Sequence, residues 1–212
     1  YDQNQFAFAS EHKALMEFPI PRAVNHDALF TYLQLNYVPA PLSMFKGVKK
    51  LLPGHFITLR NNKITVEQYF EIESSTSNDN LSYSEAQKQL RSKLTESVRK
   101  RMIADVPLGS FLSGGIDSSV IATLASQQTD SLHTFSIGFS DEPFFDETIY
   151  ANAVAKKIGT QHHVFSLTNN DLYEDLDNIL DYFDEPFADS SAIAVYLLSK
   201  RTKEHVTVAL SG

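Results

Sequence analysis

Segment 105–119 contains the residues of this chain whose types and spacing could do chemistry. It reads Asp-Val-Pro-Leu-Gly-Ser-Phe-Leu-Ser-Gly-Gly-Ile-Asp-Ser-Ser, so an apolar run ends in a glycine turn, and residues 116–126 after it have helical character. Backbone amides of such a turn point inward, and the start of the helix adds partial positive charge. Gly114 and Gly115 let the backbone approach a ligand closely. The pattern predicts a phosphate site.

Asp117 indicates how that phosphate is bound. A carboxylate repels a phosphate unless a cation lies between them, and Mg²⁺ binds through one or two carboxylates plus phosphate oxygens. Ser113, Ser118 and Ser119 add hydroxyl donors. The chain contains no Gly-Lys-Ser/Thr, so the loop is not a Walker loop, and the glycines lack the dinucleotide spacing. A plain packing turn is the alternative, but hydroxyls, glycines and an acid together favour Mg²⁺-bound phosphate.

Composition excludes several classes of protein. The net charge of −8 over 212 residues disfavours a nucleic-acid surface, and the absence of cysteine excludes disulfides and thiolate metal sites. No run of eighteen apolar residues occurs, so no membrane span is expected. The polar start lacks the pattern of a secretion signal. The first residue is tyrosine rather than methionine, which together with the chain's ending suggests a piece of a longer protein. A cytoplasmic location is compatible with these features.

Residues 1–73 are expected to be β-rich and irregular. Strands are expected at 6–9, 55–59 and 64–66, and a helix at 25–35. Asn61-Asn62 between the last two strands suggests a hairpin turn. Residues 74–81 are polar and serine-rich, which predicts a linker.

Residues 82–212 show a different pattern, in which strands and helices alternate. A first helix is expected at 82–102, with Ser82 and Glu85 as a capping box. Its buried stripe would be Ala86, Leu90, Leu94, Val98 and Met102. Then follow a strand at 106–112, a helix to 128, a strand at 133–139, a helix at 146–158, a strand at 162–167, helices at 171–183 and 190–204, and a strand at 206–210. Such alternation predicts an α/β fold, a parallel sheet with flanking helices, whose ligands lie at the carboxyl ends of the strands.

Ser113-Gly114-Gly115-Ile116-Asp117-Ser118 resembles the pyrophosphate loop of N-type ATP pyrophosphatases. The motif alone does not choose among the synthetases of that group, but the flanking sequences do. They resemble glutamine-hydrolysing asparagine synthetases at 9–15, 47–55, 101–109, 134–139, 159–163 and 184–191. The resemblance covers nearly the whole chain in order.

This resemblance implies a division into domains and a reaction. Residues 1–73 would be the C-terminal part of a type 2 glutamine amidotransferase domain, 74–81 a linker, and 82–212 the N-terminal part of a Rossmann-like ATP pyrophosphatase (adenine nucleotide α-hydrolase-like) domain. The implied ligase converts aspartate, ATP and glutamine-derived ammonia to asparagine, AMP and pyrophosphate through an aspartyl-adenylate. The family's N-terminal cysteine nucleophile is absent, so the chain alone is not expected to hydrolyse glutamine.

The resemblance also implies site residues for ATP and Mg²⁺. Asp117 would be the catalytic residue and the metal ligand. ATP would be held by Phe111, Ser113, Gly114, Gly115, Asp117, Ser118, Ser119, Ile137, Ser211 and Gly212. For Phe111 and Ile137 the family uses backbone groups, so their side chains are free to pack. The acceptor would lie at Asp189, Ser190 and Ser191, although Asp189 or Ser190 could equally be a helix cap.

Two other polar groups have structural interpretations. The acids Asp141-Glu142 and Asp146-Glu147 are read as loop residues, with Asp146 as a helix cap. His162 and His163 are adjacent in a strand, so they point to opposite faces and cannot share a metal.

Two alternative functions remain open. The chain could belong to an asparagine-synthetase-like amidotransferase with another acceptor, such as a polysaccharide-cluster homologue, or to an inactive nucleotide-binding module. Expected partners are small molecules, with neither nucleic acid nor membrane. A homodimer is compatible with the sequence and not required by it.

Overall fold

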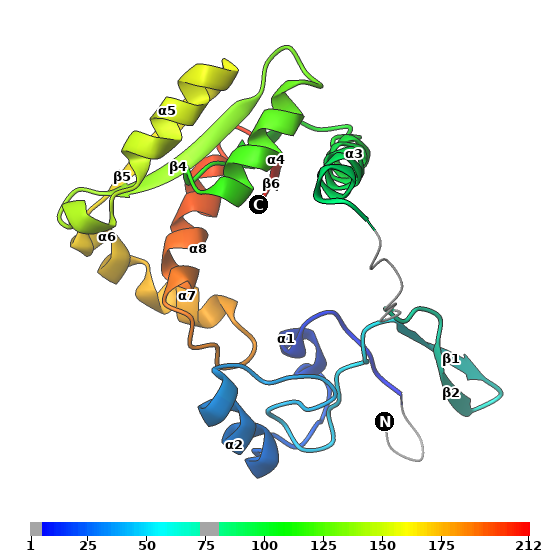
Figure 1. The fold of residues 1–212 in the computed structure, drawn as a ribbon. Helices are drawn as coiled ribbons and strands as arrows, with labels where there is room; N and C mark the ends of the chain where they lie inside the picture. Colours follow the sequence, from blue (N-terminus) through cyan, green and yellow to red (C-terminus); the bar gives the residue numbers. More distant parts are fainter. Residues whose placement is uncertain (1–5, 73–80) are drawn as a thin grey trace. The chain divides into compact units, whose positions relative to one another are not determined.

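The computed structural model of the protein describes residues 6–72 and 81–212, and Figure 1 shows its helices and strands. The chain forms two compact units. The N-terminal unit comprises Tyr1–Ser77 together with Asn178–Asp189, and the sheet unit comprises Asn78–Asp177 together with Ser190–Gly212. The linker expected at 74–81 lies outside the described residues except for Leu81. Each unit is considered by itself.

Within residues 6–72 the N-terminal unit contains two short helices and one hairpin. The helices are α1 (His12–Leu15) and α2 (His26–Leu35), and strands β1 (His55–Arg60) and β2 (Lys63–Gln68) pair antiparallel. Asn61 and Asn62 form the turn with φ of 50° and 58°, the left-handed conformation that asparagine tolerates, which confirms the predicted hairpin. The strand expected at 6–9 is wrong, because the structure forms neither a strand nor a bridge at these residues.

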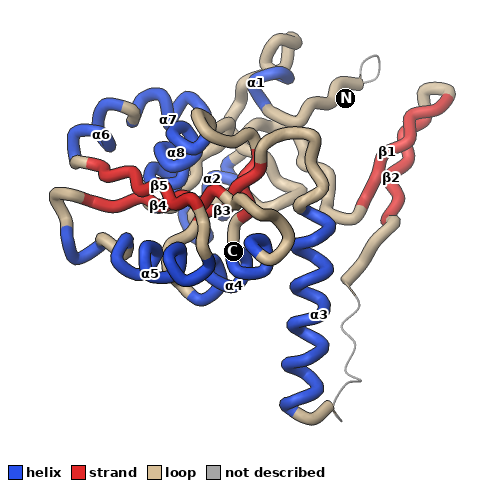
Figure 2. The backbone as a smooth tube through the Cα atoms, turned by 90° about the horizontal axis from the view of Figure 1, so that it is seen from above, coloured by secondary structure: helices blue, strands red, loops and turns tan. Residues whose placement is uncertain are grey.

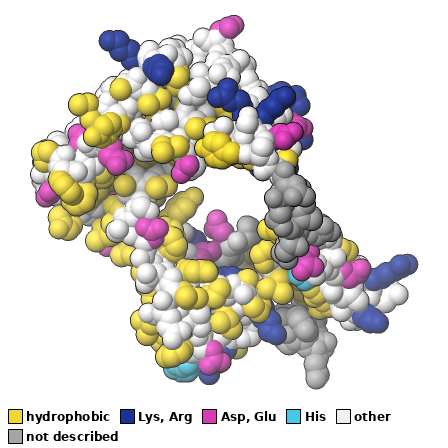
Figure 3. Space-filling view, in the orientation of Figure 1, with side chains coloured by type: hydrophobic (Ala, Val, Ile, Leu, Met, Phe, Trp, Pro, Cys, Tyr) yellow, Lys and Arg dark blue, Asp and Glu magenta, His cyan; other side chains and the backbone are white. Residues whose placement is uncertain are grey.

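The apolar core of the N-terminal unit is small. Its buried apolar residues within the described ranges are Ala28, Val38 and Ile179. The predicted helix α2 begins after Asn25, whose side chain accepts hydrogen bonds from the next turn's amides. Its apolar residues Phe30 and Leu33 are nevertheless 64% and 70% exposed, and Figure 3 shows hydrophobic side chains on the molecular surface. Apolar burial is therefore a minor source of cohesion here.

The sheet unit is built on a four-stranded parallel sheet in its described part. The strand order is β5-β4-β3-β6, with β3 at Leu108–Phe111, β4 at His133–Phe139, β5 at Gln161–Leu167 and β6 at Val208–Leu210. Each pair is parallel, in the register Ser110 to Thr134 and Ser110 to Leu210 around the central strand. The predicted α/β fold with a parallel sheet and flanking helices is confirmed.

Helices cover both faces of this sheet, as Figure 2 shows. The helices of the sheet unit include α3 (Tyr83–Arg101), α4 (Ile116–Ser126), α5 (Thr148–Ile158), α6 (Asn169–Glu174) and α8 (Ser191–Thr202), with a short 3₁₀ turn at Pro143–Phe145. Helix α7 (Leu176–Tyr182) leads from this unit into the N-terminal unit. On one face Leu112 packs with alanines of α4 and α5, and on the other Phe135 packs with Leu198 of α8. No helix in the described ranges is long and apolar enough to cross a membrane.

Two helix expectations need correction. The stripe on α3 is buried only toward its end, where Val98 is 3% exposed, whereas Leu90 is 59% exposed. The reason is that only the last turns of α3 reach the cluster of Ala125, Leu132 and Leu210. The helix expected at 171–183 is broken, because α6 ends at Glu174 and α7 begins at Leu176.

Candidate functional site

The turn between β3 and α4 has the backbone that a close-fitting loop requires. Helix α4 begins at Ile116 with Gly115 as its N-cap. Gly114 has φ of +87°, and a Cβ there would lie 2.5 Å from the Tyr150 Cβ and 2.7 Å from the Ala151 amide nitrogen. Both the left-handed backbone and the contact with α5 thus demand glycine. One side of the turn therefore packs against α5, while residues 115–117 at the start of α4 are exposed.

Serine hydroxyls close this loop internally. The Ser113 amide donates to Ser118 Oγ at 3.2 Å, and the Gly115 amide donates to Ser113 Oγ at 3.2 Å. The two hydroxyls lie 2.9 Å apart. They therefore satisfy amides that an anion would otherwise accept from. An incoming phosphate oxygen can replace a hydroxyl as acceptor, and the released hydroxyl can then donate to it.

The side chains of Asp117 and Ser119 can make hydrogen bonds or metal contacts that the described residues do not supply. Asp117 lies exposed in the first turn of α4, and its carboxylate accepts no hydrogen bond within the described ranges. The Ser119 hydroxyl is buried and lacks a hydrogen-bond partner in the described part of the chain. A buried hydroxyl without a partner is costly, so a ligand oxygen would satisfy it. A free carboxylate, an orphaned hydroxyl and amides at a helix start fit Mg²⁺-bound phosphate.

The chain segment after β6 lies against the same helix start. A Cβ on Gly212 would be 2.4 Å from the Ser118 amide nitrogen and 2.5 Å from the Asp117 carbonyl carbon. β6 pairs directly with β3, so Ser211 and Gly212 follow the neighbouring strand at the same sheet edge. The structure therefore brings 211–212 and 113–119 together.

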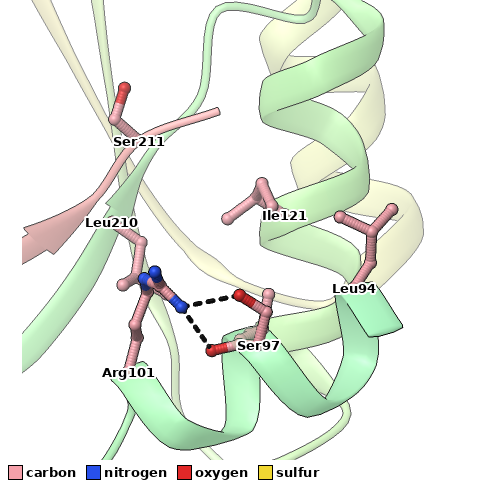
Figure 4. Close-up of a pocket in the computed structure, with 7 residues that line it drawn as sticks. Leu94, Ser97, Arg101, Ile121, Leu210 and Ser211 are labelled. Carbon is pink, nitrogen blue, oxygen red and sulfur yellow. Dashed lines mark hydrogen bonds between the residues drawn. The ribbon is translucent and has the colours of Figure 1, made fainter. Parts of the chain in front are cut away.

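A small pocket lies beside Ser211, as Figure 4 shows. It has a volume of about 110 Å³ and is lined by Leu94, Ser97, Val98, Arg101, Ile121, Leu210 and Ser211. The Arg101 guanidinium donates to the Ser97 hydroxyl at 2.6 Å and to the Ser97 carbonyl at 3.2 Å. This volume is below the several hundred Å³ typical of a nucleotide-sized ligand. We therefore assign the pocket no nucleotide.

Phe111 and Ile137 lie on the face of the sheet that α8 covers. Both are partly buried and pack against the cluster of Phe135, Leu198 and Val206. Their side chains are thus core residues, as the sequence allowed. Their backbone groups lie in neighbouring strands β3 and β4, where the predicted adenine contacts would be made.

The predicted acceptor residues lie on another element, at the start of α8. This helix begins at Ser191 with Ser190 in the N-cap position. The Ser190 side chain makes no cap hydrogen bond to described residues, so the side-chain capping function is not realised there. Asp189 is the last residue of the N-terminal unit, and Ser190 is the first after it in the sheet unit.

The acids after β4 have structural partners. Asp146 accepts a hydrogen bond from the Thr148 amide at 2.9 Å, and bonding from the side chain and backbone of Thr148 lowers the pKa of Asp146. Helix α5 starts at Thr148 with Glu147 as N-cap, so Asp146 caps from one position earlier than expected. Asp141 accepts from the Asn169 amide at 2.8 Å. These acids are loop residues, as predicted.

His162 and His163 point to opposite sides of β5, as predicted. His162 lies near the Thr134 and Ser136 hydroxyls at 2.9 and 3.2 Å, whereas His163 Nε2 is 3.0 Å from His133 Nδ1. Burial lowers the pKa of both, and neighbouring histidines lower that of His163 further. Across the described residues no three His, Cys, Asp or Glu are grouped to hold a metal ion. Any Mg²⁺ at Asp117 would need phosphate oxygens to complete its ligands.

A parallel sheet with helices on both faces, and a glycine turn that leads from a central strand into a helix, define an α/β domain with a loop suited to an anion at the carboxyl end of a strand. Two family models match the chain. The asparagine synthase model matches residues 89–212, and the glutamine amidotransferase domain model matches residues 1–70. The chain therefore belongs to the asparagine synthase family, as the motifs indicated.

Curated relatives agree with this family. The chain is 38% identical over 213 residues to Asparagine synthetase (glutamine-hydrolyzing) 1 of Bacillus subtilis. This alignment covers 99% of this chain and 33% of that protein. It is 34% identical to Putative asparagine synthetase (glutamine-hydrolyzing) 2 of Methanocaldococcus jannaschii, covering 100% of this chain and 42% of that protein. The chain thus spans a third to two fifths of these relatives' lengths.

A solved structure shares the fold only loosely. NMN synthetase from Francisella tularensis aligns with a TM-score of 0.40 and 19% identity, over 61% of this chain and 54% of that chain. That likeness is too low to carry an argument. The fold class rests on the strand order and the helix arrangement described above.

Proposed function

We propose that this chain is part of a glutamine-dependent asparagine synthetase that forms an amide at the expense of ATP. The observation that carries the proposal is the structure of the loop 113–119. Its backbone requires glycine at position 114, the Asp117 carboxylate makes no hydrogen bond to described residues, and the buried Ser119 hydroxyl lacks a hydrogen-bond partner among them. Its occurrence in a member of the asparagine synthase family supports a role in ATP chemistry. The names of the curated relatives support aspartate as acceptor.

The proposed reaction has two steps. The aspartate side-chain carboxylate attacks the α-phosphorus of ATP, the bond from that phosphorus to the bridging oxygen breaks, and pyrophosphate leaves with the electron pair. Ammonia then attacks the carbonyl carbon of the aspartyl-adenylate, AMP leaves, and a proton is lost from nitrogen to give the amide. Charge accumulates on the departing pyrophosphate in the first step, so that is where the protein must stabilise it.

The loop residues stabilise that charge in different ways. Amides of 114–118 donate to phosphate oxygens, and Ser113 and Ser118 exchange their mutual hydrogen bond for bonds to the ligand. The Ser119 hydroxyl gains an acceptor. Asp117 would hold Mg²⁺, which supplies neutralising charge between the carboxylate and the phosphates. Asp189, Ser190 and Ser191 would contact the acceptor, and the protein would act in the cytoplasm.

Product analysis of the protein at its full natural length tests the proposal. Incubation with ATP, Mg²⁺, aspartate and glutamine should yield asparagine, AMP and pyrophosphate in equal amounts. Formation of ADP in place of AMP, or the absence of any nucleotide product, would reject it.

A different acceptor is the second candidate. The chain is 27% identical over 188 residues to Amidase chyE of Penicillium rubens, so similar sequences occur in proteins that are not named asparagine synthetases. AMP formation that needs a carboxylic acid other than aspartate, with no asparagine produced, would select this second function.

A further inference from the structure

A charged network in the N-terminal unit holds the segment 178–189, which leaves the sheet unit after Asp177 and returns to it at Ser190. Glu185 is the centre of this network, with a side chain only 12% exposed. One carboxylate oxygen pairs with Lys50 Nζ, and the other accepts a hydrogen bond from the Met44 amide at 2.7 Å. A carboxylate with so little water around it must find its hydrogen-bond donors within the protein.

The neighbouring Asp184 is tied to α1. Its carboxylate accepts a hydrogen bond from the His12 amide at 2.6 Å, and its other oxygen lies 3.5 Å from Lys13 Nζ. The same lysine donates to the carbonyls of Asp181 and Tyr182 at 2.9 and 2.8 Å. The segment is thus held through the carbonyls of residues 181 and 182 and through the carboxylates of residues 184 and 185.

Two further bonds extend this attachment. The Ala188 amide donates to the Asn36 carbonyl at 2.9 Å, just after the end of α2. Lys50 Nζ also donates to the Val38 carbonyl at 2.5 Å, which orients the ammonium toward Glu185. Because the apolar core of this unit is small, these polar contacts carry much of the attachment of the segment.

We propose that Lys50 and Glu185 are positioning residues for the acceptor motif 189–191. Only three residues separate Glu185 from Asp189, and α8 begins two residues later at Ser191. A displacement of Glu185 would therefore be passed directly to the motif, and small displacements of a binding group have large effects on reaction. The inference rests on the proposed function, in which this motif binds the acceptor, and it makes acceptor binding depend on the N-terminal unit.

Steady-state kinetics of the full-length protein test this role with a matched pair of variants. Lys50→Ala removes the partner of Glu185, whereas Lys49→Ala removes the same charge from an exposed neighbour. Lys50→Ala should raise the KM for the acceptor at least fivefold while the KM for ATP stays within twofold. Lys50→Arg, which keeps a positive charge, should have an acceptor KM close to that of wild type. Lys49→Ala should leave both values within twofold.

This pattern separates positioning from a general structural role. A variant that merely folds less well would lose kcat in proportion to its folded fraction with both KM values unchanged. An unchanged acceptor KM in Lys50→Ala, or an equal rise in both KM values, would overturn the inference.

Hydrogen exchange of the amides at 184–191 provides a readout that does not need activity. Exchange in Lys50→Ala and in the milder Glu185→Gln should be at least tenfold faster than in wild type, and exchange in Lys49→Ala should be unchanged. Equal exchange in all four proteins would overturn the inference. If the wild-type protein makes no AMP from any acceptor, the proposed function fails, and these exchange rates still decide whether the ion pair holds the segment.

Discussion

Replacing Gly114 by alanine should destabilise the sheet unit by about 2–5 kcal/mol, because two costs add. Left-handed backbone costs an alanine roughly 1–2 kcal/mol more than a glycine, and Gly114 has φ of +87°. The new methyl group would also lie 2.5 Å from the Tyr150 Cβ and 2.7 Å from the Ala151 nitrogen. Forcing an extra methyl into packed atoms typically costs about 1–3 kcal/mol, and here the atoms belong to helix α5 and its backbone, which cannot rotate away.

Gly159→Ala is the matched control for this experiment. Gly159 caps α5 in the same unit with φ of +71°, and no other described atom lies within 4 Å of a Cβ placed there. It should therefore carry the backbone cost alone, about 1–2 kcal/mol. Urea unfolding of wild type and both variants, followed by circular dichroism, measures the difference. Equal losses of unfolding free energy in the two variants would refute the contact between the loop and α5.

Two further predictions concern the sheet unit. The folded-state pKa values of His162 and His163 lie below the ordinary 6.5, so the unfolded chain takes up protons first as pH falls. The free energy of unfolding should therefore decrease as pH falls through about 6.5 and level off below the folded-state pKa values. Its slope between about pH 7.5 and 5.5 should flatten when both histidines are replaced by glutamine, and an unchanged slope would contradict this. Val98→Ala should lower the free energy of unfolding by about 1.5–3 kcal/mol in urea because the side chain is buried. Leu90→Ala should lower it by less than about 1 kcal/mol because that side chain is exposed. Equal losses in the two variants would contradict the burial of α3 described above.

The order of strands and helices could be predicted because its signals are local. The apolar runs at 133–139 and 206–210 lie between turn residues, and the helix at 148–158 ends at Gly159, which has the left-handed conformation expected of a helix cap. The hairpin at Asn61-Asn62 is equally local. These features depend on neighbours in sequence, so one sequence is enough to find them.

Burial of each helix could not be predicted in the same way. The four-residue spacing from 86 to 102 is compatible with a buried stripe along all of α3, but how much of it is covered depends on where α4 and β6 lie. Periodicity gives the direction of an apolar face and not the extent of its partner. The break between α6 and α7 lacks a glycine or proline as a signal.

Part of the candidate site could be predicted from the sequence. The loop 113–119 was found through its glycines and hydroxyls, whereas the internal bond between Ser113 and Ser118 needs the three-dimensional structure. Lys50 and Glu185 are 135 positions apart in the sequence, so no local pattern predicts that they form an ion pair. The motif around 184–191 contained Glu185, but its partners could not be read from one chain.

Calorimetric titration of ATP into the protein tests most directly the claim that the loop at 113–119 binds Mg²⁺-chelated phosphates. In Mg²⁺ the wild type should bind ATP saturably, and affinity should fall at least tenfold in excess chelator or in Asp117→Asn. Asp130→Asn, which removes an exposed acid beyond the end of α4, should bind like wild type. ATP binding that is the same with and without Mg²⁺ and in Asp117→Asn would contradict the account.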